Sequence, residues 1–179
     1  VGNSYGALLA YETAHRLARA AIPVERLIVS GFRAPWLAPL EAPLHRLPSA
    51  RLRAELAARF GAHAVPAQAE FEQLEPALRA DLEACDTYRH AHAVRLAVPI
   101  DVLHMSEDTS LALDDLLAWQ TLTSGPMRLE RCPFGHFPWA THPHAMARLF
   151  VHLAGSARAA EQAPALAETL AVHSERGWM

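Results

Sequence analysis

The sequence predicts an α/β protein, in which short buried strands alternate with amphipathic helices. Apolar runs of strand length are bounded by turn residues, other segments repeat apolar residues at helical spacing, and polar loops directly follow the strand candidates. The chain has 179 residues, of which 51% are hydrophobic and 20% charged, a size and composition typical of about one globular domain. In such folds the active residues lie on loops beyond the carboxyl ends of the strands.

Composition and charge exclude several classes of function. Sixteen basic residues against 19 acidic ones leave a net charge of −3, and the basic residues are spread along the chain, so we expect no nucleic-acid partner. No apolar run approaches the roughly 20 residues that cross a bilayer, and no leader sequence opens the chain; we therefore expect a soluble cytoplasmic protein without a membrane partner. Cys85 and Cys132 lack C-x-x-C spacing and are expected to be reduced thiols.

The first elements are predicted to be a helix and a buried strand. Residues 6–21 place apolar side chains three and four positions apart, and Pro23 ends this helix. Residues 27–32 form an apolar run between breakers, which is typical of a buried strand. This order of elements supports the α/β assignment.

A helical insertion is predicted at about residues 35–93, within a domain of residues 1–155. Its first part is rich in proline and is expected to be irregular. Residues 49–61 then predict a helix that the Ser49 hydroxyl caps, and residues 70–92 predict a longer helix interrupted near Pro76.

The second half of the chain continues the alternation. Residues 97–105 predict a strand with Pro99 confined to its beginning, and residues 111–123 predict a helix. Residues 127–132 alternate apolar and polar side chains, as an edge strand does. A helix is expected to run from 141 or 142 to 154, with Pro143 in its first turn, and residues 156–179 predict a weakly helical tail outside the core.

The first six residues contain a motif with chemical meaning. Gly2-Asn3-Ser4-Tyr5-Gly6 matches G-x-S-x-G, a strained turn between a strand and a helix that presents a nucleophilic serine. The alternative is a glycine-rich start of a helix without catalytic meaning, because short motifs also occur by chance.

An acid and a histidine follow the motif in the order that serine hydrolases use. Asp108 lies in the loop after one predicted strand and His136 in the loop after the next. A serine hydroxyl is a weak nucleophile until a histidine takes its proton, and that histidine needs a carboxylate to orient it. The alternative for His136, one of 11 histidines, is a solvated loop residue.

Five blocks of the sequence carry a resemblance to known proteins: GNSYGALLAYE (2–12), LIVSGFRAP (27–35), LEPALRADLEACDTYR (74–89), LAWQTLTSGP (117–126) and FGHF (134–137). Together they resemble one family, the type II thioesterases that accompany nonribosomal peptide and polyketide synthetases. The resemblance implies an α/β-hydrolase fold, of which this chain holds the part from the nucleophile elbow onward, with a helical lid insertion. It also implies hydrolysis of acyl thioesters on the phosphopantetheine arm of acyl- or peptidyl-carrier proteins, without a metal or diffusible cofactor.

The resemblance assigns roles to individual positions. Ser4 matches the nucleophile, His136 the general base and acid, and Asp108 the orienting carboxylate, while the amide N–H of Tyr5 matches an oxyanion donor. Glu107 is the adjacent rival of Asp108, which we prefer because the family carries its acid at the later of two neighbouring acidic positions. The other nearby acids are expected to be strand-end and helix-surface charges: Asp101, Asp114 and Asp115. Apolar insertion residues could line an acyl path or simply pack together: Leu44, Leu47, Leu52, Leu56 and Phe60.

The sequence departs from the family pattern at three places. Asn3 stands where the family usually has His, and Tyr5 where it often has Met. Residues 104–106 replace the glycines that the family usually has before the acidic loop. The strands before the elbow, and the loop with the second oxyanion donor, have no counterpart in this chain. We therefore expect a fragment that is poorly stable and weakly active or inactive by itself.

Three alternative functions stay open at this point. The chain could be another serine hydrolase of the same fold, an esterase or an acyltransferase. It could be an inactive remnant that only binds a carrier protein. A metal site is the third, but the spacing of its candidate ligands fits no strong zinc pattern: Cys132, His136, His142 and His144.

Overall fold

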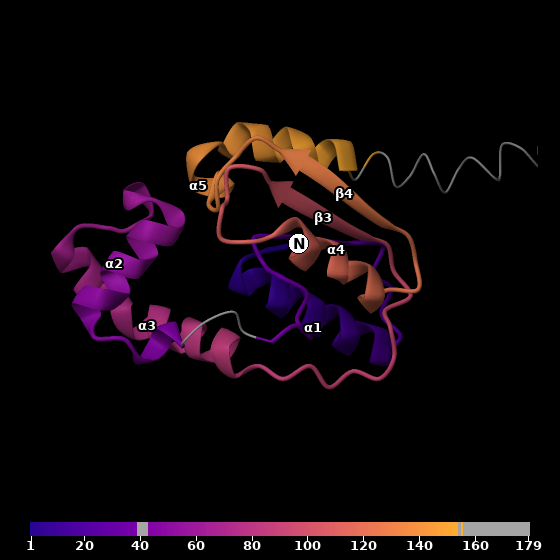
Figure 1. Cartoon of the computed structure of the whole chain (residues 1–179). Coiled ribbons are helices and arrows are strands. Elements are labelled where there is room, and N and C mark those ends of the chain that lie inside the picture. Colours follow the sequence, from indigo (N-terminus) through magenta and orange to yellow (C-terminus); the bar gives the residue numbers. More distant parts are fainter. Residues whose placement is uncertain (39–42, 154, 156–179) are drawn as a thin grey trace, which may run out of the picture. The chain divides into compact units, whose positions relative to one another are not determined.

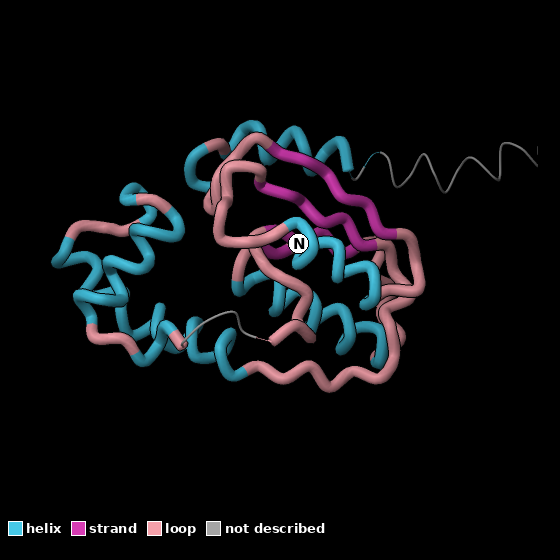
Figure 2. The backbone as a smooth tube through the Cα atoms, in the orientation of Figure 1, coloured by secondary structure: helices cyan, strands magenta, loops and turns pink. Residues whose placement is uncertain are grey.

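A parallel sheet positions the loops that carry the predicted site. The computed structural model describes residues 1–38, 43–153 and 155, and within these residues the sheet has four strands in the order β1-β2-β3-β4. Figure 2 shows the strands beside one another, joined to helices through loops. Their bounds are Gly2–Asn3 (β1), Leu27–Ser30 (β2), Ile100–Met105 (β3) and Met127–Cys132 (β4).

The strand register brings the carboxyl ends of the strands to one edge. Asn3 pairs with Ser30, Ser30 with Leu103, and Met105 with Cys132. Because all the strands are parallel, the residues that follow them emerge on the same side. The three predicted catalytic residues each follow a different strand: Ser4, Asp108 and His136.

One apolar core joins the sheet to α1 (Tyr5–Arg19), α4 (Leu113–Leu117) and the short 3-10 helix η3 (Ala118–Leu122). Tyr11 of α1 and Trp119 of η3 are almost completely buried in it, beside Val29 and Val102 of the sheet. Apolar burial of this kind is the dominant force that holds such layers together. The core therefore holds α1, and with it Ser4, against the sheet.

The insertion forms helices with a small core of their own (Figure 1). Its elements are η1 (Leu44–Arg46), α2 (Ser49–Phe60), η2 (Ala62–Ala64) and α3 (Gln68–Thr87). The buried members of this core are Leu44, Leu52, Leu56 and Phe71. The predicted helices of the insertion are thus present, with different ends.

Two details of the insertion were predicted wrongly. Pro48, not Ser49, precedes α2 at the cap position, and the Ser49 hydroxyl instead donates to the Glu75 carboxylate, 2.6 Å away. Pro76 lies inside α3 without ending it, because α3 packs into the insertion core on both sides of the proline, through Phe71 and Leu78.

α3 also ends earlier than predicted, at Thr87 rather than residue 92. The residues that follow bond to α1: Tyr88 Oη donates to Glu12 at 2.5 Å, and His92 Nε2 lies 2.8 Å from the same carboxylate. These side-chain contacts replace the helical turn that the sequence pattern predicted.

The segment after β3 is less regular than predicted. The expected helix of residues 111–123 is divided into α4 and η3. Asp115 is buried instead of lying on the helix surface: it accepts from the Ala112 amide at 3.1 Å and from Arg33 at 2.8 Å. Asp101 lies within β3, also buried, and pairs with Arg26.

The structure divides into two compact units, Val1–Phe137 and Pro138–Met179. The described part of the second unit contains α5 (Pro138–Thr141), which the sequence did not predict, and a helix over 143–153, close to the predicted one. Trp139 stacks on Phe150 within this unit. The predicted tail of residues 156–179 lies outside the described residues. No helix in the described ranges is long and apolar enough to span a membrane.

Candidate active site

Ser4 occupies a strained turn between β1 and α1. Its φ of 53° and ψ of −128° are unusual for a residue with a side chain, and such strain is often found at functional sites. The Ser4 amide donates to the Ser30 carbonyl at 2.9 Å, which continues the pairing of β1 with β2 into the turn. The turn that G-x-S-x-G predicts is therefore present.

The two glycines of the motif have different roles. A Cβ on Gly2 would lie 1.9 Å from the carbonyl oxygen of Gly6, so no side chain fits at the first position. A Cβ on Gly6 would meet nothing within 4 Å. Steric contacts therefore require glycine at position 2 of the chain but not at position 6.

Asp108 and His136 form a buried pair. His136 Nδ1 lies 2.6 Å from Asp108 Oδ2, and the other oxygen, Oδ1, accepts from the Ser110 amide at 3.0 Å and from the Ser110 hydroxyl at 2.5 Å. Burial by itself raises the pKa of Asp108, but the hydrogen bonds from His136 and Ser110 outweigh this effect and hold the pKa below its ordinary value. Asp108 is therefore an ionised acceptor beside the imidazole.

Glu107, the rival acid, does not reach His136. Its side chain is exposed, and its backbone amide donates to the Phe134 carbonyl at 3.1 Å. The structure brings Asp108 and His136 together and leaves Glu107 apart.

His136 has the geometry of a general base. Since the carboxylate of Asp108 can only accept, the neutral imidazole carries its proton on Nδ1 and its lone pair on Nε2. Nε2 is buried and has no hydrogen-bond partner among the described residues. The Phe60 ring covers the imidazole, with ring centroids 4.1 Å apart, and shields it from solvent.

Ser4 and His136 line the same cavity, which has a volume of about 200 Å³. Gly31 lies between them: a Cβ there would be 3.2 Å from His136 Cε1 and 3.3 Å from the Ser4 amide nitrogen. Eight apolar residues form much of the rest of the wall: Phe32, Ala34, Pro35, Leu37, Leu44, Phe60, Leu82 and Leu111. Polar residues complete it: Arg33, Arg59, Asp86, Tyr88 and Ser110. A small apolar group bound here would lie beside the nucleophile.

Of the five apolar insertion residues that could line an acyl path, two line the cavity: Leu44 and Phe60. The other three do not line the cavity and instead belong to the insertion core or pack against it: Leu47, Leu52 and Leu56.

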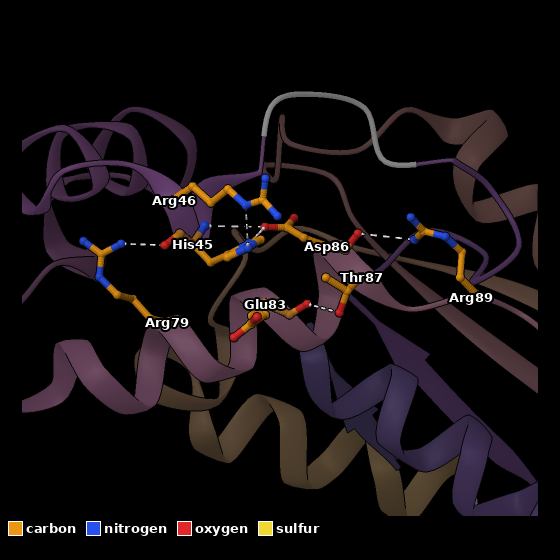
Figure 3. A network of polar contacts seen from close by, with 7 residues as sticks. All are labelled: His45, Arg46, Arg79, Glu83, Asp86, Thr87 and Arg89. Carbon is orange, nitrogen blue, oxygen red and sulfur yellow. Dashed lines mark hydrogen bonds and ion pairs between the residues drawn. The ribbon is translucent and has the colours of Figure 1, made fainter.

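A polar network borders the cavity at the end of α3 (Figure 3). Asp86 lines the cavity and lies 2.7 Å from His45 Nδ1, while Arg79 Nη1 donates to the His45 carbonyl at 2.7 Å. The neighbouring Cys85 also lines the cavity, and burial raises the pKa of its thiol to about 12. Cys85 therefore stays protonated at neutral pH and is a poor nucleophile.

Several site residues had no recognisable signal in the sequence. Gly31, with φ +61°, permits the close approach of Ser4 and His136, and Ser110 orients Asp108. These roles depend on contacts between distant parts of the chain. The one signal in the sequence is the position of Gly31 directly after a predicted strand.

Tyr5 is in a position to donate to an oxyanion. It is the first residue of α1, where a backbone N–H lacks an intrahelical partner and can bind an oxyanion.

The four candidate metal ligands of the sequence, all among the described residues, do not form a metal site. Within residues 1–38, 43–153 and 155, no group of three or more His, Cys, Asp or Glu side chains could hold a metal ion.

Comparison with known proteins places the chain in a family. Residues 1–168 match the family model described as thioesterase domain. The chain is 36% identical over 139 residues to thioesterase PikA5 of Streptomyces venezuelae, an alignment that covers 76% of this chain and 49% of that protein. The chain thus spans about half the length of this curated relative.

Solved structures agree with this assignment. The type II thioesterase BorB from the borrelidin biosynthetic cluster superposes with a TM-score of 0.73 at 32% identity, covering 84% of this chain and 62% of BorB. ClbQ from the colibactin NRPS/PKS pathway gives a TM-score of 0.78 at 26% identity, covering 89% of this chain and 69% of ClbQ. The chain therefore belongs to the thioesterase family and has the α/β-hydrolase fold of its relatives, as the sequence resemblance indicated.

Proposed function

We propose that this chain carries the catalytic centre of a serine thioesterase, which removes acyl groups from the phosphopantetheine arm of carrier proteins in nonribosomal peptide and polyketide synthesis. The observation that carries the proposal is the buried Asp108–His136 pair, whose histidine shares a cavity with Ser4 at a strained turn. Membership of the thioesterase family supports the cleavage of a thioester bond. The relatives named for biosynthetic clusters support a substrate bound to a carrier protein.

The first half-reaction acylates the serine. Ser4 Oγ attacks the thioester carbonyl carbon while His136 Nε2 takes the hydroxyl proton, and Asp108 stabilises the imidazolium that forms. The Tyr5 N–H donates to the developing oxyanion. When the tetrahedral intermediate collapses, the C–S bond breaks, the thiolate takes the proton from His136, and the acyl group remains on Ser4 as an ester.

The second half-reaction releases the acyl group. His136 Nε2 removes a proton from a water molecule, the hydroxide attacks the Ser4 ester, and a second tetrahedral intermediate forms. Its collapse returns the proton to Ser4 Oγ and frees a carboxylic acid. The proton transfers use Ser4, His136, water and the leaving thiolate.

The cavity suits an acyl group that is apolar next to the carbonyl. Leu44, Phe60 and Leu111 surround the space beside Ser4 and His136. A carrier-bound substrate would extend its pantetheine arm out of the same opening. Because the chain spans about half the length of its curated relative, the activity and partners of the whole protein belong to this proposal.

The direct test is labelling of the full chain with a fluorophosphonate, which reacts with an activated serine, followed by peptide mass spectrometry. We expect labelling at Ser4 that His136→Ala slows to a small residual rate, with His144→Ala as the control because His144 is an exposed residue of the second unit. Labelling at the same rate in wild type and His136→Ala would contradict the proposed mechanism.

A second assay identifies the bond. Acyl-pantetheine thioesters should be hydrolysed faster than oxygen esters with the same acyl group. Equal or faster cleavage of the oxygen esters would indicate an esterase instead. A folded chain without labelling or hydrolysis would indicate a remnant that at most binds carrier protein.

A further inference from the structure

Asn3, the residue before the nucleophile, links the strand that carries Ser4 to the loop that carries His136. We propose that Asn3 is a positioning residue. By bonding to the backbone of His136, it sets the position of the imidazole relative to Ser4. This inference rests on the proposed function, because it assigns to Asn3 the placement of the general base.

The link begins at the end of β2. The Ser30 hydroxyl donates to Asn3 Oδ1 at 2.6 Å, and the Ser30 carbonyl accepts from the Ser4 amide at 2.9 Å. Ser30 is 1% exposed, so its hydroxyl is confined to protein partners. One buried residue thus holds the side chain of Asn3 and the backbone of Ser4 together.

The link continues to the base. Asn3 Nδ2 donates to the His136 carbonyl oxygen at 3.1 Å. If the amide were flipped, its oxygen would face the His136 carbonyl oxygen, and two acceptors would repel each other. The observed orientation satisfies both contacts, because an amide group has one acceptor end and one donor end.

His136 is therefore held at two points. Asp108 holds its ring through Nδ1, and Asn3 holds its backbone through the carbonyl. The Asp108 bond sets the tautomer and the direction of the ring, but it connects His136 to the loop after β3 and not to β1. The Asn3 bond connects that loop to β1 itself.

Gly31 makes this arrangement sensitive to small shifts. A Cβ there would lie 2.9 Å from Asn3 Oδ1 and 3.2 Å from His136 Cε1, so both side chains pack closely on the same glycine. A loop displaced by about 1 Å would change the distance from Nε2 to Ser4 Oγ, and a misplacement of this size can lower a rate by about 100-fold.

The test compares Asn3→Leu and Asn3→Asp in the full chain. Both variants are close to asparagine in size and lack the Nδ2 donor. We expect fluorophosphonate labelling of Ser4 to slow by about 10- to 100-fold at saturating probe, with little change in the probe concentration that gives half the maximal rate. In Asn3→Asp, the new carboxylate beside the His136 loop should also move the acid limb of the pH–rate profile upward.

A double-mutant comparison separates positioning from a general loss of structure. In a His136→Ala background, Asn3→Leu should not slow the residual labelling further, because the residue through which Asn3 acts is gone. Ser30→Ala should slow labelling less than Asn3→Leu, and the double variant should equal Asn3→Leu. Additive effects in either pair would overturn the inference.

One measurement does not depend on activity. The His136 ring signals, assigned by their loss in His136→Ala, should change in NMR spectra of Asn3→Leu while most other signals stay in place. Unchanged signals in both Asn3 variants would overturn the inference. A wild-type chain whose Ser4 is never labelled, but whose His136 signals respond to Asn3, would refute the proposed function and leave the positioning role supported.

Discussion

Phe60, the last residue of α2, lies against the imidazole of His136 with ring centroids 4.1 Å apart. A residue of the helical insertion thus covers the proposed general base and lines the cavity beside Ser4. The insertion therefore shapes the space that an acyl group would occupy, which gives it the role of a lid in the proposed function.

Phe60→Ala should widen the acyl specificity. Removal of the ring enlarges the cavity beside His136, so the rate with bulky acyl-pantetheine thioesters should rise relative to acetyl-pantetheine by roughly 10-fold. The measurement is the ratio of kcat/KM for the two substrates. Leu74→Ala, at a half-exposed position of α3, is the control and should leave the ratio unchanged. An unaltered ratio in Phe60→Ala would argue against an acyl site in this cavity.

Gly31→Ala should disable the site. Its φ of +61° disfavours a side chain, and the new Cβ would press on Asn3 Oδ1 and His136 Cε1. We expect a loss of about 1–3 kcal/mol in the free energy of unfolding together with loss of Ser4 labelling. Gly135→Ala is the matched control, because a Cβ at Gly135 meets nothing within 4 Å. Labelling of Gly31→Ala at the wild-type rate would refute the close packing at Gly31.

The two glycines of the motif should respond oppositely to alanine. Gly2→Ala places a Cβ 1.9 Å from a backbone oxygen and should destabilise the fold by more than about 4 kcal/mol or prevent folding. Gly6→Ala lies in the first turn of α1 with open space around it, and should stabilise the helix by about 0.5–1 kcal/mol. Urea unfolding followed by circular dichroism measures both; a tolerated Gly2→Ala would contradict the structure of the turn.

The two adjacent acids should differ strongly in their effect on activity. Asp108→Asn removes the carboxylate on His136 Nδ1 and should lower the hydrolysis rate by about 10³–10⁴-fold, as loss of a triad carboxylate does. Glu107→Gln alters an exposed side chain and should change the rate less than about 3-fold. The measurement is hydrolysis of an acyl-pantetheine thioester by each variant. The reverse order would assign the acid to Glu107.

A buried cluster on α1 predicts loss of stability in acid. His15 stacks on His92 with ring centroids 3.7 Å apart, and burial together with the charge of His92 lowers the pKa of His15 to about 4. The unfolded chain, with an ordinary pKa near 6.5, therefore binds more protons than the folded chain between these values. Stability should fall as the pH falls through this window, by at most about 3 kcal/mol.

Neighbouring groups act in the same direction. Burial lowers the pKa of His90. Burial by itself would raise the pKa of Glu12, but hydrogen bonds from Tyr88 and His92 hold it below its ordinary value, so acid also removes the stability that this carboxylate contributes. Urea midpoints measured between about pH 7 and pH 4 should therefore decline, and less steeply in His15→Phe. His144→Asn, at an exposed position, should follow wild type, and equal slopes in wild type and His15→Phe would contradict the assignment.

Much of the fold followed from local patterns. The apolar runs at β2 and β3, the alternating residues of β4 and the periodic segment of α1 indicated the α/β order, because burial on a sheet or on one helix face leaves a pattern in the sequence itself. The course of α3 was not predictable. Packing lets the helix continue through Pro76, and contacts with Glu12 replace the helical turn after Thr87.

The sequence by itself also determined the family, the position of Ser4 on a strained turn, and the order of the acid and the histidine. Tertiary structure decided which of two adjacent acids meets His136, which insertion residues line the cavity, and that Asn3 and Gly31 join the loops. The physical reason is that these relations join residues far apart in the chain, such as Asn3 and His136. Such distances depend on strand register and backbone approach, which no local pattern records.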